Sequence, residues 1–202
     1  KKLTGISYSL IREDKNLKKS IRIDKELFKG KSKIISLMPF AKWQTKEWGD
    51  DKFIELGCRL RDHGEMLIQI LGGQNDVKRA SKIAKGIGKS AISLSGKLSL
   101  AETAVALSLS DCLVTNDTGI MHIGGAVSVP VVAVFGCTTE ELGFFPYNIQ
   151  SEVVEVKLSC RPCTAKGLPI CPKKHFKCMN YITVDMIYSA LIRKIKKQYI
   201  GV

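Results

Sequence analysis

Short apolar runs alternate with stretches of helical periodicity along most of this chain. The apolar runs span residues 34–38, 66–71, 91–94, 112–115 and 131–135. They are rich in β-branched residues and too short for typical helices, so each predicts a buried strand. Because the runs are largely apolar and do not alternate regularly with polar residues, the pattern favours a parallel sheet that is covered on both faces.

The segments between and after these runs show helical spacing of apolar residues. The predicted helices span residues 50–62, 76–87, 99–108, 119–126 and 184–197. Asn75 or Asp76 caps the second helix and Gly88 ends it, while Ser99 and Glu102 form a capping-box pattern at the third. The last helix carries apolar residues on one face, namely Ile187, Leu191 and Ile195. The chain is therefore predicted to be an α/β protein with a Rossmann-like, doubly wound parallel sheet.

In doubly wound sheets the ligand binds beyond the carboxyl ends of the strands. The loops at those ends span residues 39–49, 72–76, 95–98, 116–122 and 136–146. Within them, Asp117, Thr118 and Gly119 mark a helix start, where free N–H groups and the positive end of the helix dipole attract an anion. His122, one turn further, is expected to face the same point. Alone, this segment would equally suit a helix cap and a surface histidine.

Five segments, in order, resemble glycosyltransferase family 9, the heptosyltransferase-like group. Residues 115–122 resemble its Asp-Thr-Gly-x-x-His diphosphate segment, and residues 39–48 its Lys-x-Trp phosphate loop. Residues 71–76, 96–102 and 130–138 resemble its Gly-Gly-x-x-Asp, Gly-x-x-Ser-Leu-x-Glu and Pro-x-x-x-x-Phe-Gly-x-Thr segments. Each segment is a weak signal, whereas five in sequence indicate the family over about residues 34–182.

The resemblance implies a binding site for a nucleotide sugar. The residues expected to bind the donor are Lys46, Asp76, Leu98, Asp117, Thr118, Gly119, His122 and Thr138. Lys46 would place an ammonium on the donor phosphates, Asp76 would accept hydrogen bonds from the ribose, and Leu98 would pack on the base. The motif from Asp117 to His122 would hold the diphosphate and the sugar, with Asp117 accepting hydrogen bonds from sugar hydroxyls or from Lys46. Thr138 would touch the sugar.

The resemblance also implies a reaction. Family members have the two-domain GT-B architecture, and this chain resembles the C-terminal, donor-binding half. The expected reaction transfers a heptose-type sugar from a nucleoside diphosphate sugar, with ADP favoured, to a lipopolysaccharide-core or related glycan. The general base is expected in the N-terminal half, so no catalytic residue is assigned here and the chain is expected to be inactive alone. No cofactor is expected for catalysis.

Four of the seven cysteines crowd into a loop rich in proline and glycine. They are Cys160, Cys163, Cys171 and Cys178, with the spacing C-x2-C-x7-C-x6-C. Four thiolates can surround one tetrahedral ion, so a structural zinc site is one interpretation, with His175 as a substitute ligand. Free thiols and a paired-thiol clasp are the alternatives.

The net charge of +13 is concentrated at the two ends of the chain. Residues 1–33 hold eleven Lys and Arg against four Asp and Glu, and residues 157–202 hold ten against one. Such flanks attract polyanions, including an anionic membrane surface. The alternative function is a nucleic-acid-associated module with a four-cysteine zinc site, but the flanks are mostly Lys with few aromatics, so nucleic acid is not favoured. An NAD-type domain is disfavoured because no Gly-x-Gly-x-x-Gly follows the first strand.

The domain organisation follows from these patterns. Residues 1–33 are interpreted as a lead-in or linker, with a strand near residues 6–10. Residues 34–202 form one nucleotide-sugar-binding domain, which includes a Cys-rich loop at residues 157–182 and a C-terminal helix at 184–199. No apolar run reaches the roughly 18 residues that cross a bilayer. The expected location is cytoplasmic, with peripheral contact at the inner face of the plasma membrane.

Overall fold

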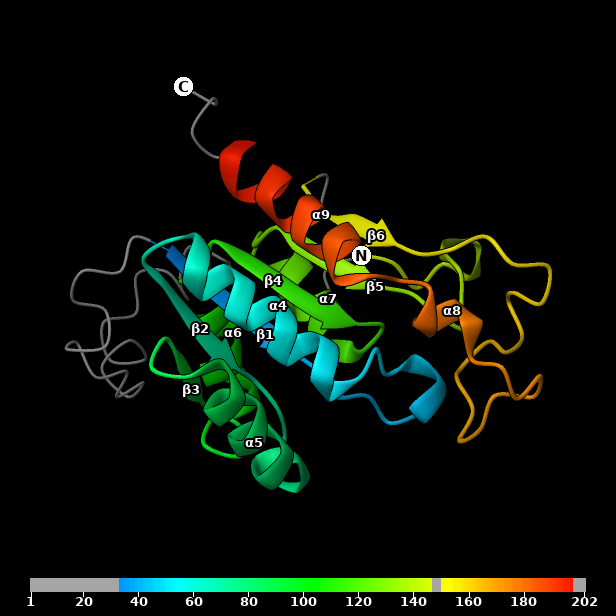
Figure 1. Ribbon diagram of the computed structural model, residues 1–202, viewed down its shortest axis with the longest axis horizontal. Helices are drawn as coiled ribbons and strands as arrows, with labels where there is room; N and C mark the ends of the chain where they lie inside the picture. Colours follow the sequence, from blue (N-terminus) through cyan, green and yellow to red (C-terminus); the bar gives the residue numbers. More distant parts are fainter. Residues whose placement is uncertain (1–32, 147–149, 198–202) are drawn as a thin grey trace.

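Six parallel strands form a sheet at the centre of the molecule (Figure 1). The computed structural model describes residues 33–146 and 150–197. The strands are β1 (Lys33–Met38), β2 (Met66–Ile70), β3 (Ala91–Ser93), β4 (Cys112–Asn116), β5 (Val131–Val134) and β6 (Glu152–Val154). They lie in the order β3-β2-β1-β4-β5-β6, and each neighbouring pair is parallel. The strand order reverses between β1 and β4, which is where a doubly wound sheet opens its ligand crevice.

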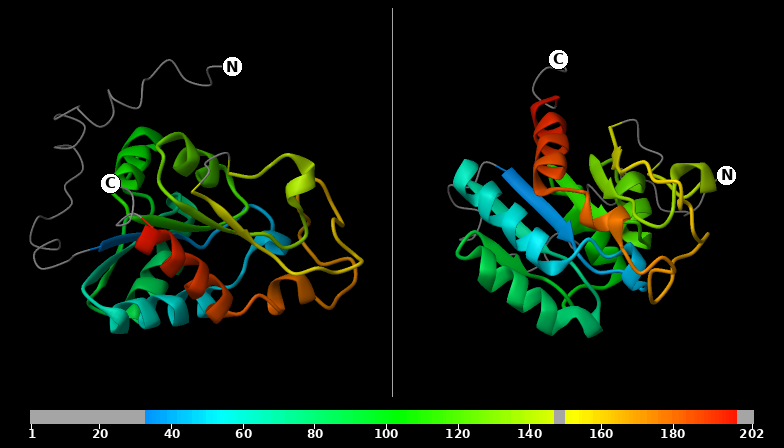
Figure 2. Two further views of the ribbon diagram at one scale, coloured as in Figure 1. Left: turned by 90° about the horizontal axis from the view of Figure 1, so that it is seen from above. Right: turned by 45° about the vertical axis from the view of Figure 1, so that its right-hand side comes forward.

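Helices cover both faces of this sheet (Figure 2). They are α4 (Asp50–His63), α5 (Val77–Ile87), α6 (Leu100–Ser108), α7 (Gly119–Ala126), α8 (Lys177–Asn180) and α9 (Val184–Lys197), with 3-10 turns η1 (Gln44–Lys46), η2 (Gln74–Asp76) and η3 (Glu140–Leu142). α4, α5 and α9 pack on one face, and α6 and α7 on the other. Val114 belongs to the first core and its neighbour Leu113 to the second. Both faces of the strands are buried, which explains the continuous apolar runs.

The predicted α/β fold is confirmed, and the ten predicted elements agree with the structure to within one residue at either end. The capping box of α6 is present, since Ser99 N–H donates to Glu102 Oε2 at 2.8 Å and Glu102 N–H donates to Ser99 Oγ at 3.3 Å. α5 ends at Gly88, whose φ of +98° suits glycine. The three apolar residues expected on one face of α9 are all buried.

Two elements that the sequence did not predict lie late in the chain. β6 adds three residues, Glu152–Val154, beside β5. α8 is a four-residue helix, Lys177–Asn180, inside the Cys-rich loop. Both are shorter than the window over which apolar periodicity can be recognised, which is why the pattern gave no signal for them.

The N-terminal segment falls largely outside the described residues. Lys33, which was assigned to the lead-in, is the first residue of β1, while the strand expected near residues 6–10 lies outside the described part. Among the helices of the described residues, none is both long and apolar enough to cross a membrane.

Candidate functional site

A cavity of about 930 Å³ opens beyond the carboxyl ends of the strands. Its walls come from the loops after β1, β2 and β4, from the first residue of α6, and from the Cys-rich loop. Five of the residues predicted for the site line it, namely Lys46, Asp76, Asp117, Thr118 and Gly119. The structure therefore brings the centre of the predicted site together from three separate loops.

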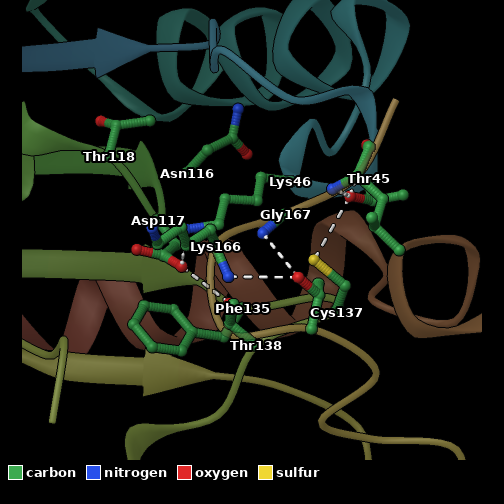
Figure 3. A network of polar contacts seen from close by, with 12 residues as sticks. Thr45, Lys46, Asn116, Asp117, Thr118, Phe135, Cys137, Thr138, Lys166 and Gly167 are labelled. Carbon is green, nitrogen blue, oxygen red and sulfur yellow. Dashed lines mark hydrogen bonds and ion pairs between the residues drawn. The ribbon is translucent and has the colours of Figure 1, made fainter. Parts of the chain in front are cut away.

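The Lys46–Asp117 ion pair forms the floor of this cavity (Figure 3). Lys46 Nζ lies 2.6 Å from Asp117 Oδ2, and their side chains are only 13% and 5% exposed. Thr138 Oγ1 donates a second hydrogen bond to the same carboxylate at 2.7 Å. The expected contact of Asp117 with Lys46 is thus confirmed. Both contacts, one of them from a positively charged group, are made to Asp117 Oδ2, so this oxygen is already occupied by the protein.

The start of α7 lies open beside this ion pair. Thr118 occupies the N-cap position but makes no side-chain capping hydrogen bond. A Cβ atom at Gly119 would meet no heavy atom within 4 Å, so no protein packing requires glycine there. The first N–H groups of the helix and its positive dipole end can therefore receive an anion that approaches the backbone closely.

The loop that carries Lys46, residues 39–49, is anchored by charged and amide side chains. Arg79 of α5 donates to both carboxylate oxygens of Glu47 at 2.9 Å and to those of Asp50 at 3.1 and 2.8 Å. These hydrogen bonds, first those to Glu47, raise the pKa of Arg79 above its ordinary value. Asn116 accepts from Trp48 N–H at 3.2 Å and donates to Pro39 O at 2.6 Å. Lys46 is thereby held in place from both sides of the loop.

The sequence predicted neither of these two anchors. Asn116 lies next to the Asp-Thr-Gly motif, so its position could have been noticed as an amide following a buried strand. Arg79 has no such local signal, because its partners precede it by 32 and 29 residues. It reaches them only through the packing of α5 beside α4.

Asp76 lies on the cavity wall at the start of α5. Its Oδ2 accepts a hydrogen bond from Gly73 N–H at 2.8 Å, which closes the Gly-Gly turn. Gly73 and Gln74 line the cavity with it. The side chain is half-buried, and its second carboxylate oxygen remains a candidate acceptor for a ligand hydroxyl.

Three residues predicted to bind the donor are not among those that line the cavity, namely Leu98, His122 and Thr138. Leu98 precedes the N-cap residue of α6 and packs against the second core, whereas Leu100 is 68% exposed and lies on the cavity wall. His122 is exposed on α7, while Ile120 and Ile123 of the same helix face the cavity.

The two tryptophans of the lysine loop have different roles. Trp48 is 3% exposed, packs edge-on against Phe53 and donates from Nε1 to Ile182 O at 2.9 Å, so it belongs to the core. Trp43 is half-buried and lines the cavity. Its ring also packs against Gly167 of the Cys-rich loop.

The structure gives no support to the predicted metal site in the Cys-rich loop. Within residues 33–146 and 150–197, no group of three or more His, Cys, Asp or Glu side chains is arranged to hold a metal ion, and this includes the predicted ligand set Cys160, Cys163, Cys171 and Cys178. All four thiols are free. Burial, together with the neighbouring cysteines, raises the pKa of Cys178 to about 11 and that of Cys163 above its ordinary value.

Other contacts hold this loop in its place. Cys163 N–H donates to Cys137 O at 3.0 Å, and Cys160 Sγ lies 4.0 Å from His175 Nε2. The buried Arg161 donates to Thr138 O at 2.7 Å and forms an ion pair with Glu155 at 2.6 Å. Because Thr138 binds Asp117, the loop is linked to the floor of the cavity. No sequence pattern indicated this role for Arg161.

Comparisons with known proteins give a consistent result. Residues 4–173 match the sequence profile described as "Glycosyltransferase family 9 (heptosyltransferase)". Lipooligosaccharide heptosyltransferase 2 of Campylobacter jejuni (serotype O:6, strain 81116) is 28% identical over 175 residues, which cover 85% of this chain and 53% of that protein.

Solved structures share the fold. The E. coli ADP-heptose lps heptosyltransferase II superposes with a TM-score of 0.69 at 20% identity, covering 83% of this chain and 47% of that one. The E. coli heptosyltransferase WaaC with ADP superposes with a TM-score of 0.64 at 21% identity, covering 82% and 45%. The chain thus spans about half the length of the relatives it matches.

Proposed function

Given that this chain belongs to glycosyltransferase family 9, we propose that its cavity binds the nucleoside diphosphate sugar of a heptosyl transfer reaction. The observation that carries the proposal is the open, uncapped start of α7 beside Lys46. An anion at this point receives backbone N–H groups, a helix dipole and a nearby ammonium together. A diphosphate has the charge and the acceptor oxygens that such a set of donors requires.

The nucleoside is assigned to the other end of the cavity, where the loops after β2 and β3 meet. Asp76 would accept hydrogen bonds from the ribose, and the exposed Leu100 would cover one face of the base. ADP-heptose is the proposed donor. One structural neighbour is described as containing ADP and another as containing ADP-2-deoxy-2-fluoro heptose, which supports this choice.

The chemical step proposed is displacement of the diphosphate from the sugar by an acceptor hydroxyl. Lys46 and the α7 start would stabilise the charge that develops on the leaving diphosphate. Neither carboxylate on the cavity wall is well placed as the general base, because Asp117 is paired with Lys46 and Asp76 is assigned to the ribose. We therefore place the base and the acceptor site in the other half of the transferase, outside the 34–202 domain.

The proposed acceptor is a glycan of the lipopolysaccharide-core type, as the names of the relatives suggest. The basic flanks of this chain would suit the phosphorylated, membrane-bound surface on which such an acceptor sits. Peripheral contact of the protein with the inner face of the plasma membrane is proposed on this basis.

Calorimetric titration of the 202-residue chain with ADP, UDP and GDP tests the donor site. We expect ADP to bind with a Kd of about 10–1,000 μM, the range suited to a product on a half-site. Gly119→Val is expected to abolish this binding, because its side chain would occupy the open space over the helix start while meeting little of the protein. Gly64→Ala is the matched control, since Gly64 also has open space around it but lies after α4, away from the cavity.

The outcomes separate clearly. Failure of every nucleotide to bind would contradict the proposed site. Equal binding of ADP by the wild-type chain and a folded Gly119→Val variant would show that the phosphates do not bind at the start of α7. A preference for UDP over ADP would change the proposed donor but not the proposed site.

A further inference from the structure

The Cys-rich loop reaches the cavity and places a lysine on its wall. Lys166 is one of the lining residues, together with Lys42 and Lys46 of the lysine loop. It lies 120 residues after Lys46 in the sequence, in the spacer between Cys163 and Cys171, where the motifs predict no role for it.

Lys166 is held in position by the residues that follow it. Thr45 N–H and Thr45 Oγ1 both donate to Leu168 O, at 3.2 and 2.8 Å, and Leu168 N–H donates to Thr45 Oγ1 at 2.7 Å. Gly167 has a φ of +106° and packs so closely on Trp43 that a Cβ atom would come within 2.5 Å of its Cδ1. The two loops are therefore joined directly beside Lys46, and Lys166 is fixed at the junction.

The ammonium of Lys166 remains available to a ligand. Its side chain is exposed, and within the described part of the chain no ion pair or side-chain hydrogen bond engages it. Lys46, by contrast, is already paired with Asp117. Only the backbone of Lys166 is used locally, where its N–H donates to Thr164 Oγ1 at 3.2 Å.

The order of the strands places Lys166 at a defined end of the cavity. Leu100 follows β3, Asp76 follows β2, and the Lys46 loop and the α7 start follow β1 and β4. Lys166 comes from the chain beyond β6. Its loop contacts the loop after β1 through Leu168 and the loop after β5 through Cys163, whose N–H donates to Cys137 O. Lys166 therefore reaches the cavity from the β5 side of the sheet, opposite the end assigned to the nucleoside.

We propose that Lys166 is a second phosphate-binding residue of this cavity and contacts the distal phosphate, the one that carries the sugar. The inference rests on the proposed function, because it assumes that the base binds at Leu100 and the ribose at Asp76. An exposed lysine that is anchored at its backbone keeps a charge for the ligand without a competing carboxylate. The Cys-rich loop then serves as a wall of the donor site.

Titration of the wild-type chain and of Lys166→Ala with ADP and AMP tests this inference. We expect the Kd for ADP to rise about 3- to 10-fold in Lys166→Ala, with little change for AMP, and the difference to shrink when salt is raised. Lys166→Arg should retain most of the ADP affinity. The matched control is Lys173→Ala, which removes the same charge from the same loop at an exposed position outside the cavity.

Each other result decides against one claim. If the wild-type chain binds no nucleotide, the proposed function fails first. If the wild-type chain binds ADP and a folded Lys166→Ala binds it equally well, Lys166 does not contact phosphate. Equal losses in Lys166→Ala and Lys173→Ala would show a general charge effect, and equal losses for AMP and ADP would move Lys166 away from the distal phosphate.

Discussion

The lysine loop, residues 39–49, and the Cys-rich loop, residues 157–182, both bring a lysine to the same cavity, but in opposite electrostatic states. Lys46 is 13% exposed and forms an ion pair with a buried carboxylate. Lys166 is exposed, with no ion pair among the described residues. The carboxylate of Asp117 offsets part of the charge of Lys46, and the ion pair also fixes the shape of the site. An exposed, unpaired lysine adds net positive charge that a ligand can use.

The two loops are also anchored by different forces. The lysine loop depends on ionic and amide side chains, with Arg79 and Asn116 as the principal partners. The Cys-rich loop depends on backbone hydrogen bonds to Thr45 and on the close contact of Gly167 with Trp43. The first should therefore be sensitive to loss of charge, and the second to added volume.

The largest effect is expected from Asp117→Ala, which leaves Lys46 without its counter-charge. We expect the free energy of unfolding to fall by about 3 kcal/mol, because removing one partner of a buried ion pair leaves the other charge buried and unpaired. Urea denaturation measures it. Asp62→Ala is the control, since the Asp62–Arg61 pair is exposed and removing it should change the free energy of unfolding little. Equal losses in the two variants would show that Lys46 is not buried as a pair.

A smaller effect is expected from Gly167→Ala in the Cys-rich loop. Its Cβ atom would approach the Trp43 ring and its φ is unfavourable for alanine, so we expect about 2 kcal/mol of destabilisation. Gly143→Ala isolates the backbone term, because Gly143 also has a positive φ (+78°) but open space around it, and should cost about 1 kcal/mol. If Gly167→Ala cost no more than Gly143→Ala in thermal denaturation, the loop would not be packed on Trp43.

The smallest effect on stability is expected from Arg79→Ala, which releases Glu47 and Asp50. Arg79 is 42% exposed, so we expect about 1 kcal/mol, together with weaker ADP binding because Lys46 loses its anchor. Arg193→Ala is the control, since it breaks the ion pair with Glu152 far from the cavity and should leave ADP affinity unchanged. Calorimetry and denaturation on both variants check the two expectations. Unchanged ADP affinity in Arg79→Ala would show that the loop holds its shape without this arginine.

The fold was predictable from sequence because the signals for it are local and repeated. Each strand is a short β-branched run, and features such as the Ser99–Glu102 capping box mark helix ends directly. β6 escaped because three residues cannot display a period. Its place in the sheet depends on pairing with β5, which no local pattern records.

The sequence predicted residues of the candidate site where a motif coincides with the end of a strand, as at Asp117. It could not predict which side chains of a single turn line the cavity, because that depends on the geometry of the turn. Leu98 and Leu100 are both leucines near a helix start, and only the observed turn of α6 shows which faces the cavity. Arg79 and Arg161 contact partners more than 20 residues away in the sequence, so no spacing rule reveals their roles. The cysteine spacing is compatible with a metal site, but no cluster that could hold a metal ion is found among the described residues. The loop is instead held by contacts such as the hydrogen bond from Cys163 N–H to Cys137 O.

The position of α9 has a consequence for the order in which the molecule can be completed. Ile187 and Leu191 belong to the same core as Phe53 of α4 and Val132 of β5, yet they are made more than fifty residues after β5. During synthesis the part of that face formed by β4, β5 and β6, against which α9 packs, stays uncovered until this helix leaves the ribosome. A nascent chain that stalls before Val184 would expose a row of apolar side chains, which is the condition that recruits chaperones and promotes aggregation.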